Sequence, residues 1–350
     1  MRKIVDHFDP QGGKHCITNS LKQIFSYGGI EMTEAMMFGL GSGLSFLYLN
    51  QEISPMVNGR CKIFEFEEKL AKRLHLDIEC KSGSNYERVL ERNKEMLDHD
   101  IPLLIYVDMP YLSYLGLDPD SHFGGHAVVL FGYDDEREVF YISDRDNYDF
   151  PIRTPHGQSA EDYHLVSYEE LKKARTSTYR PFPAKNKYLE INFDGYQSPQ
   201  KDVLVEAIQE TCETMMNAPA KLLGLNGIHK FSKEILKWKN FSMEKRKRAG
   251  VTNYFQISKD GGTGGGIFRK MYGEFLMEAA PILNSSAVHK LGSAYVEIGN
   301  EWDRLADILW ELSLNGDEKL LPVMAEMIQK LYERETKVME QLSEEIKVLM

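Results

Sequence analysis

The spacing of apolar residues changes once along this chain of 350 residues, near residue 195. Before that point, segments with helical spacing alternate with short apolar runs rich in β-branched residues, which are typical of strands. After it, almost every segment repeats its apolar residues at helical spacing. We therefore predict two domains, an α+β domain at residues 1–195 and an all-helical domain at residues 196–350.

Local patterns predict the elements of the first domain. The segment CITNSLKQIFSYGG places Ile17, Leu21 and Phe25 on one helical face and ends at a pair of glycines. Further helices are expected near residue 33 and over residues 63–74, 84–98 and 167–175. Strands are expected over residues 101–108, 126–134, 138–144 and 187–193. Because only the short segment DDER joins the second and third of these strands, they predict an antiparallel hairpin.

Helical spacing dominates the second domain. Helices are expected over residues 200–216, 228–239, 266–282, 286–313 and 317–348. The last of them carries an apolar stripe formed by Leu320, Leu321, Met324, Met327, Ile328, Leu331, Val338, Leu342 and Ile346. Such a stripe favours packing on the helix's own domain, and a seam between two copies of the chain, as in a homodimer, is the alternative.

Composition excludes several classes of protein. A net charge of -11 argues against nucleic acid as a partner, because phosphate binding needs a broad basic surface. The four cysteines are irregularly spaced and form no CxxC pair, so we expect reduced thiols and no metal site. The N-terminus has no apolar core of signal-peptide length, and nowhere do 18 uncharged apolar residues follow one another. We therefore expect a cytoplasmic protein without membrane contact.

Cys16 stands at the predicted start of the first long helix, after the loop DPQGGKH. A thiol is a good nucleophile as the thiolate, and both a helix N-terminus and a nearby imidazolium lower its pKa. A cysteine before a helix is by itself usually a small buried hydrophobe. The prediction of a nucleophile therefore depends on its partners.

The predicted hairpin supplies two such partners. His126 follows two glycines and begins an apolar strand, so it lies at the strand's edge, where a general base can reach a helix terminus. Asp144 ends the neighbouring strand, where a carboxylate can hold the imidazole in the tautomer that accepts the thiol proton. The chain order Cys, His, Asp is that of papain-like enzymes. We predict a catalytic triad of Cys16, His126 and Asp144.

Other residues compete for these roles. His122 and His15 are alternative bases, and Asp146 is the alternative carboxylate, because it lies two residues further on the same side of an extended chain. The oxyanion also needs donors, of which the backbone amide of Cys16 is one. Gln11 is the candidate side-chain donor, although it precedes the cysteine by five residues, whereas papain-like enzymes usually have six.

The chain resembles the butirosin biosynthesis protein H family over nearly its whole length. In the first domain the resemblance is carried by GKHCITNSLKQIFSYGG, FGLGSGLSFLY, GGHAVVLFGYDD and YISD. In the second domain GGTGGGIFRKMYGEFLMEAAPIL and YVEIGNEWDRLADIL resemble the helical domain, of the DUF4872 type, that often follows it. The resemblance implies a papain-like fold, similar to the C39 peptidases, with Cys16 as the acylated thiol, His126 as the base and Asp144 as its orienting group.

The family also implies a reaction. In its namesake, an acyl group moves from the phosphopantetheine thioester of an acyl carrier protein to an amine of an aminoglycoside. For this chain the resemblance implies an acyltransferase of antibiotic or other secondary-metabolite biosynthesis, with a small-molecule amine as acceptor and no bound cofactor. A cysteine peptidase, amidase or thioesterase would use the same triad with water as the acceptor. A non-catalytic binding or scaffold protein on this fold is the alternative from a different class.

One basic segment fits an acidic carrier protein. The cations that could dock such a partner are Lys237, Lys239, Lys245, Arg246, Lys247 and Arg248. A solvated helix surface is the other interpretation of this segment.

A glycine cluster at residues 261–266 precedes one of the predicted helices. It lacks both the Walker lysine-serine ending and a preceding strand, so we predict no nucleotide site there. As a flexible loop it could instead cover the active site or bind the pantetheine arm. On the helix that follows, Arg269 and Tyr272 are the candidate substrate contacts, while Phe268 and Leu276 are predicted core residues.

Overall fold

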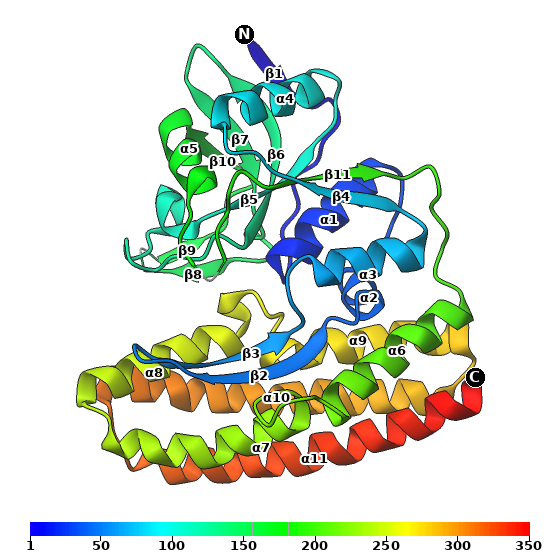
Figure 1. Ribbon diagram of the computed structural model, residues 1–350, viewed down its shortest axis with the longest axis vertical. Helices are drawn as coiled ribbons and strands as arrows, with labels where there is room; N and C mark the ends of the chain where they lie inside the picture. Colours follow the sequence, from blue (N-terminus) through cyan, green and yellow to red (C-terminus); the bar gives the residue numbers. More distant parts are fainter. Residues whose placement is uncertain (156, 181) are drawn as a thin grey trace. The chain divides into compact units, whose positions relative to one another are not determined.

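The computed structural model describes residues 1–155, 157–180 and 182–350. The chain divides into two compact units, formed by residues 1–34 with 75–196 and by residues 35–74 with 197–350. The first unit contains a large sheet, and the second consists mainly of helices (Figure 1). The prediction of an N-terminal mixed domain followed by a C-terminal helical domain is confirmed at this level.

Residues 35–74 are the exception to the predicted domain division. They were predicted to belong to the first domain, but they belong to the second unit. There the ring of Phe38 stacks on that of Phe268, with 5.2 Å between centroids and 9° between planes. The amide of Val57 donates a hydrogen bond to Asn253 Oδ1 at 2.9 Å. The spacing of apolar residues shows which face of a segment is buried, but it does not identify the element that covers this face.

The sheet of the first unit is antiparallel throughout, with the strand order β10-β7-β6-β5-β11-β4 and with β1 also paired to β6. Its strands are β1 (Arg2–Ile4), β4 (Asp77–Lys81), β5 (Leu103–Val107), β6 (His126–Asp134), β7 (Val139–Ser143), β10 (His164–Ser167) and β11 (Tyr188–Asn192). A separate pair is formed by β8 (Ile152–Thr154) and β9 (Gly157–Ser159). The predicted hairpin is confirmed as β6 and β7, with Val129 opposite Ser143.

Helices cover this sheet. They are α1 (Cys16–Tyr27), α4 (Tyr86–Asp98) and α5 (Tyr168–Thr176), with the short 3-10 helices η1 (Met109–Tyr111) and η2 (Ser113–Leu115). Helix α1 packs against β5 and β6 and buries Ile17, Leu21 and Phe25, as its spacing predicts. Strand β6 is buried along its whole length. The core of this unit therefore lies where α1 crosses the central strands.

The second unit surrounds the hairpin of β2 (Leu44–Asn50) and β3 (Pro55–Arg60) with helices. These are α2 (Glu34–Leu40), α3 (Glu65–Leu74), α6 (Lys201–Met216), α7 (Gly224–Glu234), η3 (Ile235–Asn240), α8 (Met243–Ile257), η4 (Lys259–Gly261), η5 (Gly266–Phe268), α9 (Arg269–Leu283), α10 (Ser286–Asn315) and α11 (Leu320–Leu349). The long helices α10 and α11 pack along each other (Figure 1). Within the described ranges, no helix has the length and hydropathy that crossing a bilayer requires.

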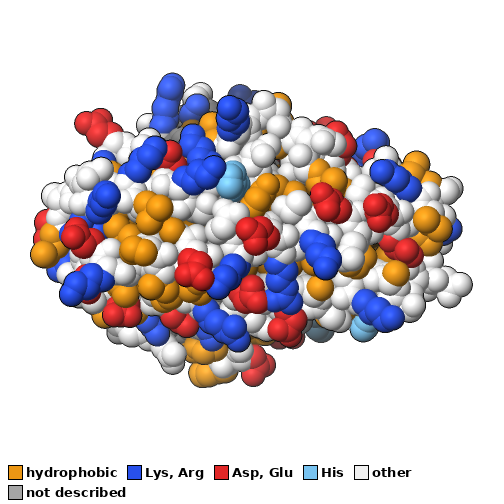
Figure 2. Space-filling view, turned by 90° about the horizontal axis from the view of Figure 1, so that it is seen from below, with side chains coloured by type: hydrophobic (Ala, Val, Ile, Leu, Met, Phe, Trp, Pro, Cys, Tyr) orange, Lys and Arg blue, Asp and Glu red, His pale blue; other side chains and the backbone are white. Residues whose placement is uncertain are grey.

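The apolar stripe of α11 is covered within its own unit. Its buried members are Leu321, Met324, Ile328, Leu331, Val338, Leu342 and Ile346. Seen from the side on which α7 and α11 lie in Figure 1, basic and acidic side chains are interspersed over the surface (Figure 2). Packing within the unit thus accounts for the stripe, which is the first of the two interpretations given above.

Candidate active site

Cys16 is the first residue of α1, so its thiol stands at the positive end of the helix dipole. His15 precedes it as the N-cap residue, with an extended backbone. The side chain of Cys16 is half-buried. Among the described residues, none accepts a hydrogen bond from the Cys16 amide. This amide is therefore available to an oxyanion, as expected.

His126 and Asp144 form a buried pair at one end of the β6–β7 hairpin. His126 Nε2 lies 2.8 Å from Asp144 Oδ2. The other carboxylate oxygen, Oδ1, accepts a hydrogen bond from the Arg145 amide at 2.7 Å. The hydroxyl of Tyr114 donates a further hydrogen bond to Oδ2 at 2.8 Å. Since Nε2 faces the carboxylate, Nδ1 is the ring nitrogen left to face a nucleophile.

The group beside this imidazole is the Cys16 thiol, and the two groups shift each other's pKa. Burial alone raises the pKa of the Cys16 thiol, but the charge of His15 and the hydrogen bond with His126 lower it well below its usual range. Burial lowers the pKa of His126, but the charge of Asp144, its hydrogen bond and the contact with Cys16 raise it to about 10. Against burial, the His126 charge holds the pKa of Asp144 below its usual range. These shifts favour the thiolate, the imidazolium and the carboxylate over the neutral forms of the three groups.

The other cysteines differ from Cys16. Burial raises the pKa of Cys61 and of Cys212 to about 12, so both are neutral thiols at neutral pH. Cys80 is exposed. All four cysteines are free, as the sequence led us to expect.

Glu34 holds the start of α1 in place, and the sequence analysis did not find it. Its buried carboxylate accepts hydrogen bonds from the Lys14 amide at 2.7 Å and from the His15 amide at 3.0 Å. It also accepts one from the Thr18 hydroxyl at 2.7 Å. Glu34 thereby fixes the residues on both sides of Cys16, and a negative charge at this helix end is favourable.

The alternative carboxylate and one alternative base have other partners. Both oxygens of Asp146 lie within 2.9 Å of His164 Nε2, so Asp146 is not the partner of His126. His122 Nδ1 lies 2.8 Å from Asp108 Oδ2. The other alternative base, His15, does lie beside the Cys16 thiol. The structure thus brings together Cys16, His126 and Asp144, and their catalytic role stays a prediction.

Gln11 lies in the loop before α1. Its amide donates a hydrogen bond to Gln23 Oε1 at 3.1 Å, and its carbonyl accepts one from Asn19 Nδ2 at 2.9 Å. These contacts tie the loop to the helix. In the described part of the chain, no group is hydrogen-bonded to the half-buried side-chain amide of Gln11. Its role as the second oxyanion donor stays a prediction.

Arg269 and Tyr272 have structural roles instead of the predicted contact with substrate. Both side chains are fully buried in the second unit. The Arg269 guanidinium lies 2.9 Å from Glu335, which is equally buried. The ring of Tyr272 packs edge-on against that of Tyr295. Arg269 was interpreted as a binding residue because the local sequence does not show that its guanidinium pairs with Glu335, 66 residues further along the chain.

The glycine cluster also has a packing role. Gly266 has a φ of 58°, and a Cβ atom added to it would lie 2.4 Å from the Cα of Gly299. Its amide donates a hydrogen bond to Asp303 Oδ1 at 2.7 Å. The cluster therefore allows the chain before α9 to pack closely on α10. A role of the cluster in covering the active site or binding the pantetheine arm stays a prediction.

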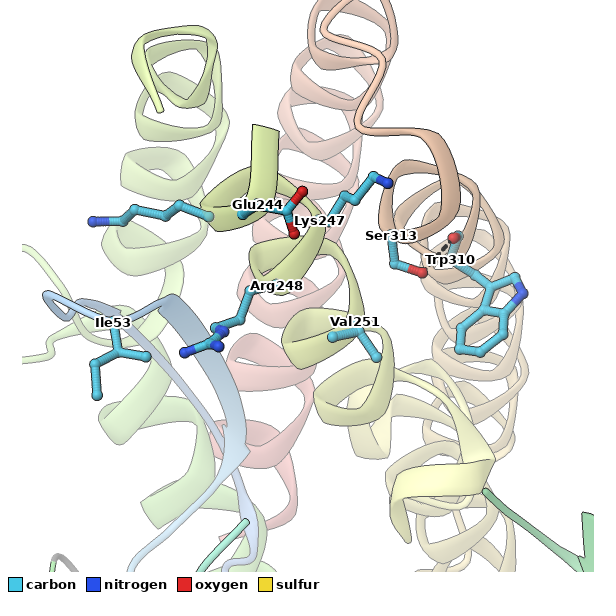
Figure 3. Close-up of a pocket in the computed structure, with 8 residues that line it drawn as sticks. Ile53, Glu244, Lys247, Arg248, Val251, Trp310 and Ser313 are labelled. Atoms are coloured by element: carbon cyan, nitrogen blue, oxygen red, sulfur yellow. Dashed lines mark hydrogen bonds between the residues drawn. The ribbon is translucent and has the colours of Figure 1, made fainter. Parts of the chain in front are cut away.

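The predicted basic segment contributes to an open pocket in the second unit, with a volume of about 530 Å³ (Figure 3). The pocket is lined by Ile53, Glu244, Lys245, Lys247, Arg248, Val251, Trp310 and Ser313. Lys247 and Arg248 form no ion pair with any residue in the described ranges. Arg246 departs from the prediction, because it is buried and donates a hydrogen bond to the Gly316 carbonyl at 2.7 Å. Of the six predicted cations, Arg246 is thus a structural residue.

The described residues include no group of three or more His, Cys, Asp or Glu side chains that could hold a metal ion. A thiolate at a helix terminus, paired with an imidazole that a carboxylate orients, is the arrangement that nucleophilic catalysis by cysteine uses.

Two known families match the chain. The family described as butirosin biosynthesis protein H, N-terminal, matches residues 15–145, a span that includes Cys16, His126 and Asp144. A domain of unknown function, DUF4872, matches residues 169–342. The two matches together show the two-domain architecture expected from the resemblance to the butirosin biosynthesis protein H family, which confirms that resemblance. A comparison with curated proteins gave no match.

Proposed function

We propose that this protein is a cysteine-dependent acyltransferase of secondary-metabolite biosynthesis, with a papain-like fold in its first unit. The observation that carries the proposal is the buried pair of His126 and Asp144, with 2.8 Å between Nε2 and Oδ2, and the Cys16 thiol that interacts with this imidazole at the start of α1. The fold assignment is supported by a cysteine-bearing helix that packs on an antiparallel sheet with the histidine and the aspartate at its edge.

The reaction has two steps. In the first, the Cys16 thiolate attacks the carbonyl of a phosphopantetheine thioester, and the C–S bond to pantetheine breaks. The His126 imidazolium gives its proton to the departing thiolate, which leaves a neutral imidazole and an acylated Cys16. In the second step an amine attacks this thioester, His126 takes the amine proton, and the Cys16 thiolate leaves. The imidazolium and thiolate of the resting enzyme are thus restored.

Each residue of the site has a stated role in these steps. Asp144 orients His126 and stabilises its charge when it holds the proton. The negative oxygen of each tetrahedral intermediate is bound by the Cys16 amide and by the side-chain amide of Gln11. No cofactor is held by the enzyme, because the pantetheine arm arrives with the donor.

Mass spectrometry of the intact protein tests the first step. The wild type, exposed to the acetyl thioester of N-acetylcysteamine, should gain one acetyl group, and Cys16→Ala should gain none. Cys80→Ala is the matched control and should be acylated like the wild type, because it removes an exposed thiol outside the site. An adduct that persists in Cys16→Ala, or its absence from the wild type, would contradict the proposal.

A second measurement separates the transferase from its rivals. Adding a primary amine to the thioester reaction should produce an amide and accelerate the loss of acyl-enzyme. Hydrolysis that no amine affects would instead identify a thioesterase, amidase or peptidase. Alkylation of Cys16 by iodoacetamide no faster than that of Cys80 would favour a non-catalytic scaffold.

We also propose that the donor is an acidic carrier protein that docks at the basic pocket of Figure 3. Lys247 and Arg248 supply cations without ion-pair partners in the described part of the chain, and Trp310 and Val251 supply apolar surface. Lys239 lies on the preceding η3, while Lys237 is paired with Glu234 and Lys245 binds a backbone carbonyl. In a protein of net charge -11, this local excess favours an anionic partner.

Charge reversal tests the docking site. Lys247→Glu with Arg248→Glu should raise KM for a carrier-bound thioester by about tenfold and leave the rate with the N-acetylcysteamine thioester unchanged. Lys330→Glu with Lys337→Glu changes the net charge equally, but on α11. If this control raises KM as much, the effect comes from net charge and the pocket is not the docking site.

A further inference from the structure

Three His–Asp pairs lie at one end of the seven-stranded sheet, where four neighbouring strands begin or end. Strand β5 ends beside the start of β6, β6 starts beside the end of β7, and β7 ends beside the start of β10. The pairs at this edge are His122–Asp108, His126–Asp144 and His164–Asp146. The proposed reaction uses the middle pair and leaves the other two unexplained.

Tyr114 joins the middle pair to one of its neighbours. Its hydroxyl donates a hydrogen bond to Asp144 Oδ2 at 2.8 Å, the oxygen that also faces His126. Its ring lies flat on the imidazole of His164, with 3.7 Å between centroids and 6° between planes. His164 is in turn fixed by both oxygens of Asp146. The stacking of the Tyr114 ring on His164 therefore fixes the direction of its hydroxyl, which points to Asp144.

We propose that Tyr114 is a positioning residue for the acyl transfer, which acts by holding Asp144 and by sharing the carboxylate oxygen that binds His126. This inference rests on the proposed function. Burial and the charge of Asp144 raise the pKa of the Tyr114 hydroxyl well above its usual value, so it remains a donor throughout the working pH range. A hydrogen bond to the charged form of a carboxylate makes it less basic. Tyr114 thereby limits how strongly Asp144 retains the imidazolium proton, which His126 must release to the leaving thiolate.

The influence of Tyr114 on the titration of the site also depends on the charges that surround the Asp144 carboxylate. The titratable and charged groups that face Asp144 or Tyr114 are His126, Cys16, Arg145, Asp146 and His164. Replacing a tyrosine by phenylalanine alters none of these charges. A shift in titration after this change would thus arise from the lost hydrogen bond.

The test is the pH dependence of Cys16 alkylation by iodoacetamide, followed by mass spectrometry of the intact protein. The wild-type rate should show a lower inflection for thiolate formation and an upper one for loss of the imidazolium proton. In Tyr114→Phe, Asp144 becomes more basic, so the upper inflection should rise by about half a pH unit. Turnover with a thioester and an amine should fall by about tenfold in kcat, with KM within twofold, because the proton is released less readily.

Two comparisons make the test specific. Tyr111→Phe is the matched control, since it removes a hydroxyl from the neighbouring η1 and should leave the upper inflection in place. In an Asp144→Asn background, Tyr114→Phe should no longer shift the upper inflection, because both changes act on the hydrogen bond between Tyr114 and Asp144. An upper inflection unchanged in Tyr114→Phe, or an equal shift in the Asn background, would overturn the inference. A wild-type Cys16 that reacts like exposed Cys80 would instead overturn the proposed function.

Discussion

Replacing Cys16 by alanine should reveal a dependence of the free energy of unfolding on pH. In the wild type, the titration of the Cys16 thiol cancels this contribution of His126. In the folded protein, the lowered pKa of Cys16 and the raised pKa of His126 favour the state in which the pair holds one proton and this proton lies on the imidazole. In the unfolded chain, between about pH 6.5 and pH 8.5, they also hold one proton, but it lies on the thiol. Folding then moves a proton from sulfur to nitrogen and binds none. The pair therefore adds no slope to the free energy of unfolding against pH.

Without the thiol, the pKa shift of His126 alone decides whether the free energy of unfolding rises or falls with pH. Burial lowers its pKa, but Asp144 raises it above the unfolded value of about 6.5, so the folded protein keeps a proton that the unfolded chain loses. This stabilisation is complete below pH 6.5 and is lost as the pH rises toward the folded pKa. The slope is about 1.4 kcal/mol per pH unit. Cys16→Ala should therefore lose up to about 2.7 kcal/mol, relative to the wild type, between pH 6.5 and pH 8.5.

Urea denaturation at pH 6.5, 7.5 and 8.5 measures this difference. All other groups titrate alike in the two proteins, so they cancel when the variant is compared with the wild type. Cys61→Ala is the matched control. Burial raises the pKa of Cys61 to about 12, so its thiol stays protonated in the folded protein, and in the unfolded chain it begins to ionise only near pH 8.5. Its removal should therefore change the free energy of unfolding by no more than about 0.4 kcal/mol over this range. Parallel lines for Cys16→Ala and the wild type would refute the thiolate–imidazolium pair.

Three further outcomes follow from the contacts described. Asp144→Asn should reduce kcat/KM less than His126→Ala does, because the base remains when only its orienting group is changed. Glu34→Gln should lower the free energy of unfolding by about 2 kcal/mol, through weakened charge-assisted hydrogen bonds at the start of α1, and hydrogen exchange should accelerate in the peptide that contains Cys16. Arg269→Met should cost about 3–5 kcal/mol in urea denaturation by leaving the Glu335 carboxylate buried and unpaired. If Arg269 bound substrate instead, KM would change and stability would not.

Much of the fold was predictable where the signal is local. Strand β6 runs from His126 to Asp134 as predicted, because its apolar run begins after two glycines and ends in the turn DDER. Helix α1 begins at Cys16 and ends before a glycine pair. Strands β3 and β4 went undetected for physical reasons. The first, PMVNGR, has its apolar residues next to one another in its first half, and the second is the half-exposed edge strand DIECK, so neither shows a clear apolar alternation.

In the candidate site, too, local sequence signals reveal some residues, whereas others are placed only by tertiary contacts. Cys16, His126 and Asp144 were found because each stands at the end of an element whose limits the sequence reveals. Glu34 and Tyr114 lie in short segments, where nothing local shows that they meet the start of α1 and the carboxylate of Asp144. The groups that would carry out the chemistry can thus be recognised from one sequence, whereas those that position them depend on tertiary contacts. A chain that kept the three predicted residues but lost the Glu34 carboxylate or the Tyr114 hydroxyl would match the same pattern with an altered site. A pattern match alone therefore does not establish a working site, and measuring the titration of Cys16 and His126 tests what the pattern leaves open.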